Sequence, residues 1–207
     1  HLCENLQQVY DTDHDVIVPG GEGILGLEAA IASLVAPGDR VLCISNGIYG
    51  DGFADFVADY DGEAELVAAA YDAGYDLDAI EDALAAAEEA GEPFKIATLV
   101  HCETPTGTLN DLSPVLDLLD EYDVLSVVDA VSSLGGTPLP TDRIDVCLGA
   151  SQKCFSAPPG LTTAAVSDRA WEAMEHREPT SLYPNLLPWR DTIDGFPYPH
   201  PHPTTAP

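Results

Sequence analysis

The sequence predicts an α/β fold, a three-layer sandwich with a mainly parallel sheet. Apolar runs of strand length alternate with segments of helical period from the first glycines to about residue 176. The strand runs are continuously apolar, which is typical of parallel strands covered on both faces. The 207 residues suffice to bury about two-thirds of the unfolded surface, so a full core is available.

The helices begin and end at recognisable signals, and the strands are the apolar runs between them. The helix expected over 23–34 is closed by Pro37 and Gly38. Pro114 is compatible with the helix expected over 112–122 because it stands in the first turn. The other elements expected are an extended segment at 16–18, strands at 41–45, 64–69, 95–100, 124–128, 144–148 and 162–166, and helices at 51–60, 77–90 and 169–175.

The sequence becomes proline-rich and aperiodic from residue 179, which favours a linker or an extended tail. We therefore expect one domain over 1–178 and a proline-rich segment over 179–207. The chain begins at His1 rather than at Met and ends at Pro207, which indicates a segment of a longer protein.

The chain is strongly acidic, with 36 Asp and Glu residues against seven Lys and Arg and a formal charge of -29. No basic stripe is present to bind nucleic acid or an anionic membrane. Self-repulsion at this charge destabilises the compact state in dilute buffer and is screened at molar salt, so we expect a halophilic, salt-rich cytoplasm. The five cysteines are odd in number and lack zinc spacing, which predicts reduced intracellular thiols. The sequence also lacks a signal peptide and a membrane-length apolar run, which again predicts a cytoplasmic protein.

Chemistry is expected beyond the carboxyl ends of the strands, where ligands bind in open parallel sheets. Residues 21–26 match the pattern G-x-G-x-x-G, but the next strand ends in Ser45-Asn46-Gly47 instead of the acidic residue that a nicotinamide site requires. Glycines that open a helix leave backbone N–H groups free to bind a phosphate. The alternative is that these glycines only ease a turn.

Lys153 is one of two lysines in the chain, the other being Lys95, and it precedes a rigid Ala-Pro-Pro-Gly stretch. Asp129 ends an apolar strand, where a carboxylate is costly unless a cation meets it, although a turn-forming role is an alternative. Pyridoxal phosphate needs a lysine amine for covalent attachment, a carboxylate for its ring nitrogen and amides for its phosphate. The combination predicts a pyridoxal-phosphate site with Lys153 and Asp129 as catalytic residues.

Five blocks spread over nearly the whole chain carry a family resemblance. They are Gly21-Glu22-Gly23 with Leu27-Glu28-Ala29-Ala30, Asn46-Gly47-Ile48-Tyr49-Gly50, the run from His101 to Gly107, the run from Val128 to Leu139, and Ser151-Gln152-Lys153 with Ala157-Pro158-Pro159-Gly160. On these blocks the chain resembles the class V aminotransferases of fold type I, in particular the alanine-glyoxylate and serine-pyruvate aminotransferases. The resemblance implies that residues 1–178 form a pyridoxal-phosphate-binding large domain.

The resemblance also implies a role for each matching residue. Lys153 would hold the cofactor covalently and then carry the proton, and Asp129 would pair with the ring nitrogen. Tyr49 would stack on the ring, Val131 would pack on its other face, and Thr104 would bind the ring hydroxyl. The groups expected to bind the phosphate are the amides of Gly23 and Ile24, the side chain of Gln152 and, from the second subunit of a homodimer, Thr204.

Each of these residues also has an ordinary alternative. Tyr49 could pack as a loop aromatic, Val131 could be a core residue, and Thr104 could form a turn beside Pro105. His101 and Glu103 lack a third ligand nearby, so we expect no metal site and a structural role at the strand end. Cys154 is expected to be a small packing residue.

The predicted function is therefore a pyridoxal-phosphate-dependent transaminase that moves an amino group from alanine or serine to glyoxylate or pyruvate. The resemblance implies that an arginine of a C-terminal domain outside the 207 residues grips the substrate carboxylate. Three alternatives remain. They are a lyase or desulfurase of the same class, a nicotinamide-binding oxidoreductase, and a non-catalytic binding partner.

Overall fold

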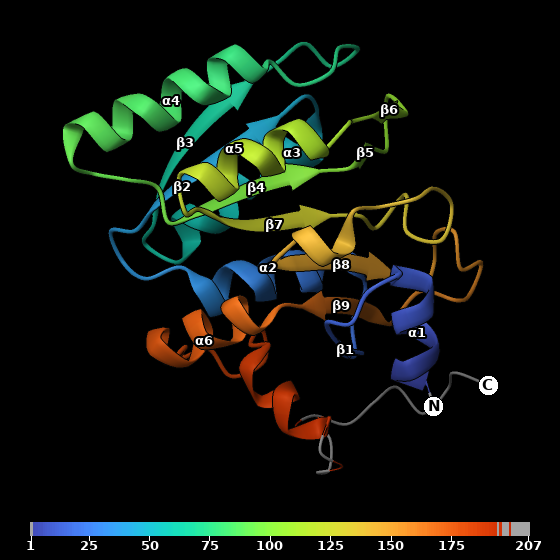
Figure 1. Ribbon diagram of the computed structural model, residues 1–207. Helices are drawn as coiled ribbons and strands as arrows, with labels where there is room; N and C mark the ends of the chain where they lie inside the picture. The colour runs from blue at the N-terminus through green and yellow to red at the C-terminus, as the bar shows by residue number, and fades with distance from the viewer. Residues whose placement is uncertain (1, 194, 196–198, 200–207) are drawn as a thin grey trace. The chain divides into compact units, whose positions relative to one another are not determined.

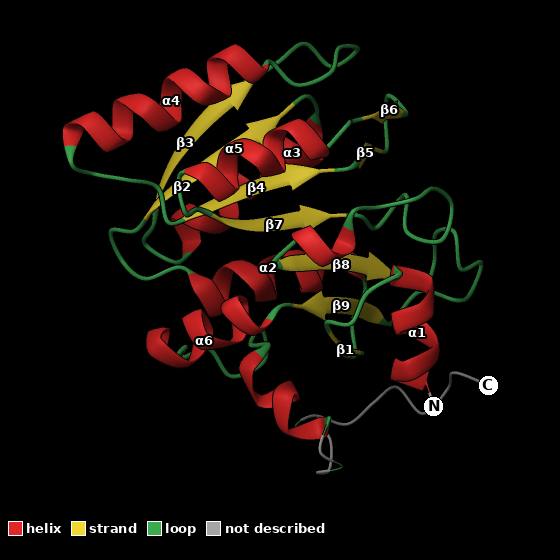
Figure 2. Cartoon of the chain, in the orientation of Figure 1, coloured by secondary structure: helices red, strands yellow, loops and turns green. Residues whose placement is uncertain are grey.

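The computed structural model describes residues 2–193 together with residues 195 and 199. It divides the chain into two compact units. Unit 1 consists of the stretches up to Leu34 and from Ala130 onward, and unit 2 is Val35–Asp129. Helices and strands alternate along the chain in both units, as Figures 1 and 2 show.

Unit 2 is built on parallel strands, whose arrowheads point the same way in Figure 1. Strand β2 pairs with β3 on one side and with β4 on the other, and β4 pairs with β7. Because parallel strands end at one edge, Ser45, Val100 and Asp129 mark a common carboxyl edge. The strand bounds are β2 (Arg40–Ser45), β3 (Glu63–Ala68), β4 (Ile96–Val100) and β7 (Leu125–Asp129).

The helices of unit 2 are α3 (Ile48–Asp59), α4 (Leu77–Ala90) and α5 (Ser113–Glu121), and a short hairpin joins β5 (Cys102–Glu103) to β6 (Thr108–Leu109). Helix α4 has the bounds that the sequence predicts. Its first turn is capped by the carboxylate of Asp76, which accepts a hydrogen bond of 3.2 Å from the amide of Ala79. Its end is closed by Gly91, whose φ of 74° is the left-handed conformation that favours glycine.

Strand β3 departs from the prediction of strands covered on both faces. It is the edge strand of the parallel set, and most of its side chains are exposed, including Glu63, Glu65 and Leu66. Acidic side chains on an edge strand discourage pairing with a further strand. The apolar run at 64–69 thus predicted a strand correctly without predicting its burial.

Unit 1 has antiparallel strands, and its β9 (Thr162–Val166) pairs with both β1 (Asp15–Ile17) and β8 (Val146–Ala150). Its helices are α1 (Leu2–Tyr10), α2 (Gly23–Leu34) and α6 (Asp168–Arg177), with 3-10 turns η1 (Thr141–Arg143) and η2 (Leu187–Thr192). The predicted α/β fold with a mainly parallel set of strands is confirmed, and unit 1 supplies its antiparallel part. Helix α1, which the sequence analysis did not predict, buries Leu6 and Tyr10.

Helix α2 has the predicted bounds and is buried over most of its surface because it is made of small and aliphatic residues. A Cβ added to Gly26 would lie 2.4 Å from Cγ2 of Thr162. This close helix–strand packing gives the third glycine of the G-x-G-x-x-G pattern a structural reason that involves no nucleotide.

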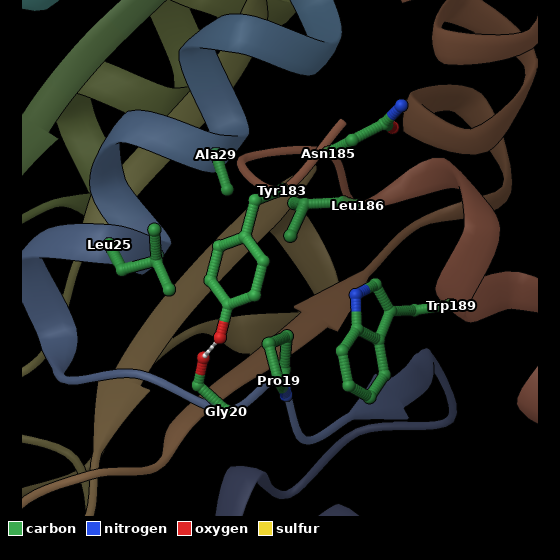
Figure 3. Close-up of a pocket in the computed structure, with 9 residues that line it drawn as sticks. Pro19, Gly20, Leu25, Ala29, Tyr183, Asn185, Leu186 and Trp189 are labelled. Atoms are coloured by element: carbon green, nitrogen blue, oxygen red, sulfur yellow. Dashed lines mark hydrogen bonds between the residues drawn. The ribbon is translucent and has the colours of Figure 1, made fainter. Parts of the chain in front are cut away.

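Residues 183–189 pack onto α2, although the sequence there is proline-rich and aperiodic. Leu186 and Trp189 are buried, the amide of Leu186 donates to Oγ of Ser33 at 2.8 Å, and the Tyr183 hydroxyl donates to the carbonyl oxygen of Gly20 at 2.8 Å. Figure 3 shows this segment facing Leu25 and Ala29 of α2 across an apolar pocket of about 10 Å³. That volume holds about one water molecule, so the segment is packed as part of unit 1.

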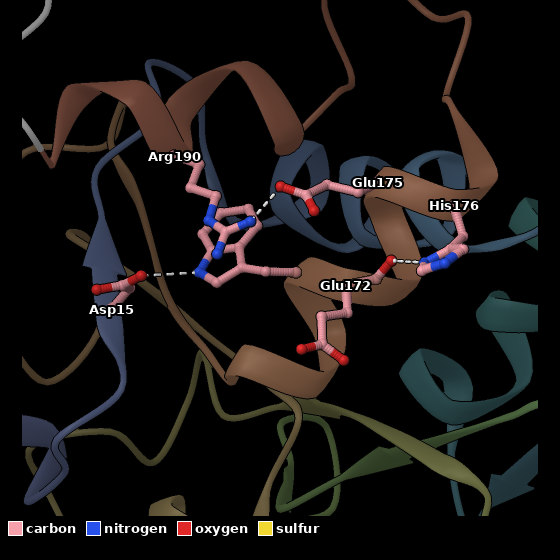
Figure 4. A network of polar contacts seen from close by, with 6 residues as sticks. Asp15, Glu172, Glu175, His176 and Arg190 are labelled. Atoms are coloured by element: carbon pink, nitrogen blue, oxygen red, sulfur yellow. Dashed lines mark hydrogen bonds and ion pairs between the residues drawn. The ribbon is translucent and has the colours of Figure 1, made fainter.

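Helix α6 is fixed to unit 1 by its buried Trp171, whose indole N–H donates to the carboxylate of Asp15 at 3.0 Å. The guanidinium of Arg190 lies 5.8 Å from the Trp171 ring centroid and pairs with Glu175, as Figure 4 shows for the ion pair. The Arg190 contacts join η2 to α6. Among the residues described, no helix is long and apolar enough to cross a lipid bilayer.

Candidate active site

The glycine loop that leads into α2 is bound along its length to the start of β9. The amide of Gly21 donates to the carbonyl oxygen of Gly160 at 2.8 Å, Gly20 forms an isolated antiparallel bridge with Leu161, and the amide of Thr162 donates to the carbonyl oxygen of Pro19 at 3.1 Å. Gly21 has a φ of 146°, a conformation open to glycine and strained for other residues. The loop thus enters α2 in one defined conformation.

Gly23, the first residue of α2, lies against Val131 and the end of β8. A Cβ on Gly23 would be 2.9 Å from Cγ2 of Val131 and 3.2 Å from Cβ of Ala150. The structure therefore brings together two of the predicted cofactor-binding residues, Gly23 and Val131. Ile24 follows with 42% of its side chain exposed, and the amides of Gly23 and Ile24 have no acceptor within the helix because they belong to its first turn.

Lys153 lies in a turn directly after β8 and is half-buried. Its carbonyl oxygen accepts from the amide of Ser156 at 2.9 Å. Ser151 ties the turn to β9, since its amide donates to the carbonyl oxygen of Leu161 at 3.0 Å and its hydroxyl donates to that of Pro158 at 2.7 Å. The same stretch of chain, Leu161 and Thr162, therefore anchors both the Lys153 turn and the glycine loop.

The two lysines of the chain differ in their surroundings. Lys95 forms an ion pair with Asp39 at 3.1 Å and is 67% exposed. For Lys153 no ion pair is found within the described part of the chain. A half-buried amine without a carboxylate partner is available for covalent chemistry.

Gln152, next to Lys153, has a buried Oε1 for which the described residues provide no hydrogen-bond partner. A buried polar atom without a partner is costly and indicates a group that completes the site. A flip of the Gln152 side-chain amide exchanges its oxygen and its NH2 group. The buried position can therefore equally hold the NH2 donor that a phosphate requires.

Cys154 is exposed, and it packs at the surface as a small residue, as the sequence predicts. Its Sγ lies 3.4 Å from the carbonyl oxygen of Ser132, and a Cβ on Gly136 would come within 2.7 Å of that sulfur. The thiol therefore covers Gly136 at the surface. All five cysteines are free, and burial raises the pKa of the Cys43 thiol.

Asp129, in unit 2, is the last residue of β7 and pairs in register with Val100 of β4. Its side chain is 6% exposed, and its carbonyl oxygen accepts from the amide of His101 at 2.9 Å. The position at the carboxyl edge of a parallel set of strands agrees with the position the sequence predicts.

Tyr49 stands in the first turn of α3, where Glu103 holds the backbone. The fully buried carboxylate of Glu103 accepts from the amides of Tyr49 and Gly50, each at 3.3 Å. A carboxylate is favourable at this place because the first turn of a helix presents unpaired N–H groups and a positive dipole end. Glu103 thus has the structural role that the sequence analysis favoured over metal binding.

Thr104 follows Glu103 directly and is exposed. The backbone position of Tyr49 and that of Thr104 are therefore linked through one buried side chain. Tyr49 and Thr104 could be predicted from the sequence, but the part of Glu103 in placing them could not, because a glutamate in a motif has no pattern that distinguishes capping from catalysis.

A buried amide pair supports the same hairpin. The side chains of Asn46 and Asn110 bond to each other at 2.8 and 3.2 Å, and each also donates to a backbone carbonyl oxygen, of Ala73 and of Val100. The hydroxyl of Tyr75 bonds to both backbone groups of Val100, and burial raises its pKa. His101 is buried as well, and its burial lowers its pKa. Within the residues that the structure describes, no cluster of ligands could hold a metal.

These residues fit pyridoxal phosphate. The first amides of α2 face no helical acceptor, and Gln152 has a buried side-chain oxygen without a partner among the described residues. Lys153 in unit 1 and Asp129 in unit 2 carry the amine and the carboxylate that the sequence predicts for this cofactor. Thr204, the residue predicted to reach a second subunit's phosphate, lies outside the described residues.

Comparison with known proteins supports the family resemblance over nearly the whole chain. The family model of class-V aminotransferases matches residues 7–183. An aminotransferase of Methanocaldococcus jannaschii is 35% identical over 190 residues, covering 90% of this chain and 48% of the relative. The pyridoxamine–pyruvate transaminase of Mesorhizobium japonicum is 35% identical over 176 residues, covering 84% of this chain and 44% of the relative.

Among solved structures, the crystal structure of an alanine–glyoxylate aminotransferase from Nostoc superposes with a TM-score of 0.88 at 29% identity, covering 99% of this chain and 55% of that one. The chain therefore spans about half the length of these relatives. The resemblance inferred from the five sequence blocks is confirmed, and its cofactor, pyridoxal phosphate, follows from the family. The chain belongs to the class-V aminotransferase family.

Proposed function

We propose that this chain carries the cofactor-binding part of a pyridoxal-phosphate-dependent transaminase that moves an amino group from alanine or serine to glyoxylate or pyruvate. One relationship supports it above all: the Lys153 turn and the glycine loop before α2 are both anchored by Leu161 and Thr162. Relatives of this chain are named for transamination with pyruvate and with glyoxylate.

Pyridoxal phosphate, when bound, supplies an electron-accepting ring that stabilises the negative charge left at the substrate Cα after its proton departs. In our proposal the Lys153 amine attaches the cofactor and then moves the proton between Cα and the cofactor carbon. Asp129 keeps a proton on the ring nitrogen, because a buried carboxylate favours a cationic neighbour.

The remaining residues hold and orient the cofactor in this proposal. Tyr49 stacks on one face of the ring and Val131 packs on the other, while Thr104 hydrogen-bonds the ring hydroxyl. The amides of Gly23 and Ile24 and the side chain of Gln152 bind the phosphate. We further propose a cytoplasmic homodimer in which Thr204 of one copy reaches the phosphate held by the other.

Two of the alternative chemistries are less well supported. The G-x-G-x-x-G pattern does not favour a nicotinamide enzyme, because the next strand ends in Ser45-Asn46-Gly47 without the acidic residue that such a site requires. A desulfurase needs a reactive cysteine near the cofactor, and the exposed Cys154 next to Lys153 is the candidate to test.

The test is a half-reaction screen on the full-length natural protein loaded with pyridoxal phosphate. Alanine and serine are expected to remove the absorbance band of the lysine-bound cofactor, and glyoxylate or pyruvate to restore it. Lys153→Ala abolishes the band, whereas Lys95→Ala, which changes the exposed lysine, leaves it. Release of sulfide from cysteine would favour the desulfurase, and a band that survives Lys153→Ala would contradict the proposal.

One observation favours a second candidate, in which pyridoxamine is the amino donor and pyruvate the acceptor. Glu22 stands between the two glycines of the loop and is exposed, so its charge disfavours a phosphate dianion on the amides beside it. Pyridoxamine carries no phosphate and avoids this repulsion, and one relative is named for this reaction.

Glu22→Ser separates the two candidates. If pyridoxal phosphate is the resident cofactor, the variant binds it more tightly and keeps transaminating alanine. If pyridoxamine is the substrate, the wild-type protein converts pyridoxamine and pyruvate to pyridoxal and alanine without added cofactor. In that case the Glu22→Ser variant loses the preference for pyridoxamine over its phosphorylated form. Product analysis of a single turnover measures both.

A further inference from the structure

Thr162, the first residue of β9, is fully buried and binds the glycine loop through its side chain. Its hydroxyl lies 2.8 Å from the carbonyl oxygen of Glu22 and 3.2 Å from that of Gly21. Its amide donates to the carbonyl oxygen of Pro19 at 3.1 Å. One residue thus holds the carbonyl groups of three residues of the loop.

These bonds determine where the loop's amides point. In a trans peptide the C=O and the following N–H point in opposite directions. The carbonyls of Gly21 and Glu22 face Thr162, so the N–H groups of Glu22 and Gly23 face away from it. They point to the same side as the open first turn of α2, to which the amide of Ile24 belongs.

The rotamer of Thr162 is fixed by its methyl group. A Cβ on Gly26 would lie 2.4 Å from Cγ2 of Thr162 and 3.2 Å from its Oγ1, so the methyl is wedged against α2. A β-branched residue is stiff at χ1. Packing of the methyl group therefore aims the hydroxyl at the loop.

The neighbouring Thr163 provides a contrast. It is also buried, and its hydroxyl bonds to the hydroxyl of Tyr10 at 2.8 Å. Successive residues of a strand point to opposite faces of the sheet. The Thr163 hydroxyl therefore bonds to Tyr10 on one face, whereas the Thr162 hydroxyl bonds to the glycine loop on the other. Of these two threonines, only Thr162 contacts the glycine loop through its side chain.

We propose that Thr162 is a positioning residue whose hydroxyl orients the amides of Glu22, Gly23 and Ile24 to bind a phosphate group. The inference rests on the proposed function, in which that phosphate belongs to the cofactor. Without the hydroxyl, the carbonyl oxygens of Glu22 and Gly21 lose the hydrogen that they share, and the peptide units are free to turn. The amides then meet a phosphate less well, while the ring contacts are unchanged.

The first experiment measures dissociation constants for pyridoxal phosphate and for unphosphorylated pyridoxal with the full-length natural protein, by spectrophotometric titration. Thr162→Val is expected to weaken binding of pyridoxal phosphate by about tenfold or more and that of pyridoxal by less than about threefold. Thr162→Ser, which keeps the hydroxyl, restores binding of pyridoxal phosphate. Thr163→Val lowers stability and leaves the ratio of the two constants unchanged.

The second experiment observes the Gly23 amide directly. Glu22-Gly23 is the only Glu-Gly pair in the 207 residues, so in this 207-residue chain labelling glutamate carbonyl carbon with 13C and glycine nitrogen with 15N selects this peptide in NMR spectra. Inorganic phosphate is expected to shift its resonance in the wild-type protein and in Thr163→Val, and to shift it far less in Thr162→Val.

The outcomes separate the inference from the proposed function. Equal losses for pyridoxal phosphate and pyridoxal in Thr162→Val, or a phosphate-induced shift that this variant keeps, would overturn the role of Thr162. A wild-type protein that fails to bind pyridoxal phosphate, yet shows a phosphate shift that Thr162→Val removes, would overturn the proposed function and support the inference. A wild-type Gly23 amide that does not respond to phosphate would overturn the inference.

Discussion

Gly47 and Glu103 approach so closely that a Cβ on Gly47 would lie 2.1 Å from Cγ of Glu103. The φ of Gly47 is 177°, an extended conformation that any residue can adopt. The glycine is therefore required for space and not for its backbone freedom. That space lets a fully buried carboxylate reach the amides of Tyr49 and Gly50 at the start of α3.

Gly47→Ala is expected to displace Glu103 and to destabilise the protein by about 1–3 kcal/mol, because the first turn of α3 loses its acceptor and the core is overpacked. Gly52→Ala, inside α3, is the control, since nothing lies within 4 Å of the Cβ that it adds. That variant is expected to be neutral or stabilised by up to about 1 kcal/mol. Equal denaturation midpoints for the two variants would show that the Glu103 contact contributes nothing.

The buried His101 is expected to make stability depend on pH. Burial lowers its pKa in the folded protein, so the unfolded chain binds the proton more strongly. Its contribution is complete above about pH 6.5, the unfolded value, and is lost as pH falls through the lowered folded pKa. Chemical denaturation from pH 8 to 5 should show this loss, and His101→Gln should reduce the slope. An unchanged slope in the variant would show that other groups cause the loss.

The charge of -29 predicts that potassium chloride stabilises the protein up to molar concentration, because the Debye length falls to about 3 Å at 1 M. Melting temperature and cofactor binding, measured from 0.1 M to 3 M, should both rise with salt. A variant with Glu81, Glu88 and Glu89 on the exposed face of α4 changed to Gln should depend less on salt. Equal stability at low and multimolar salt would rule out the halophilic interpretation.

Elements with local signals were predicted well from the sequence. The bounds of α2, α4 and β9 agree with the predicted ranges, because glycine, capping and apolar periodicity specify them locally. Helix α1 and the packed segment at 183–189 were missed, since their buried residues, Tyr10 and Trp189, are isolated in polar or proline-rich sequence. The antiparallel pairing of β9 was missed too, because an apolar run carries no information on strand direction.

The sequence by itself predicted the cofactor of this protein. A lysine in a chain with only two, a strand-end aspartate and a glycine-rich helix start each have an ordinary alternative, and it is their combination that predicts pyridoxal phosphate. The tertiary structure decided which residues hold these groups in place. Thr162 contacts Gly21, which lies 141 positions away in the sequence, and Glu103 contacts Tyr49, which lies 54 positions away. No local sequence pattern encodes such contacts.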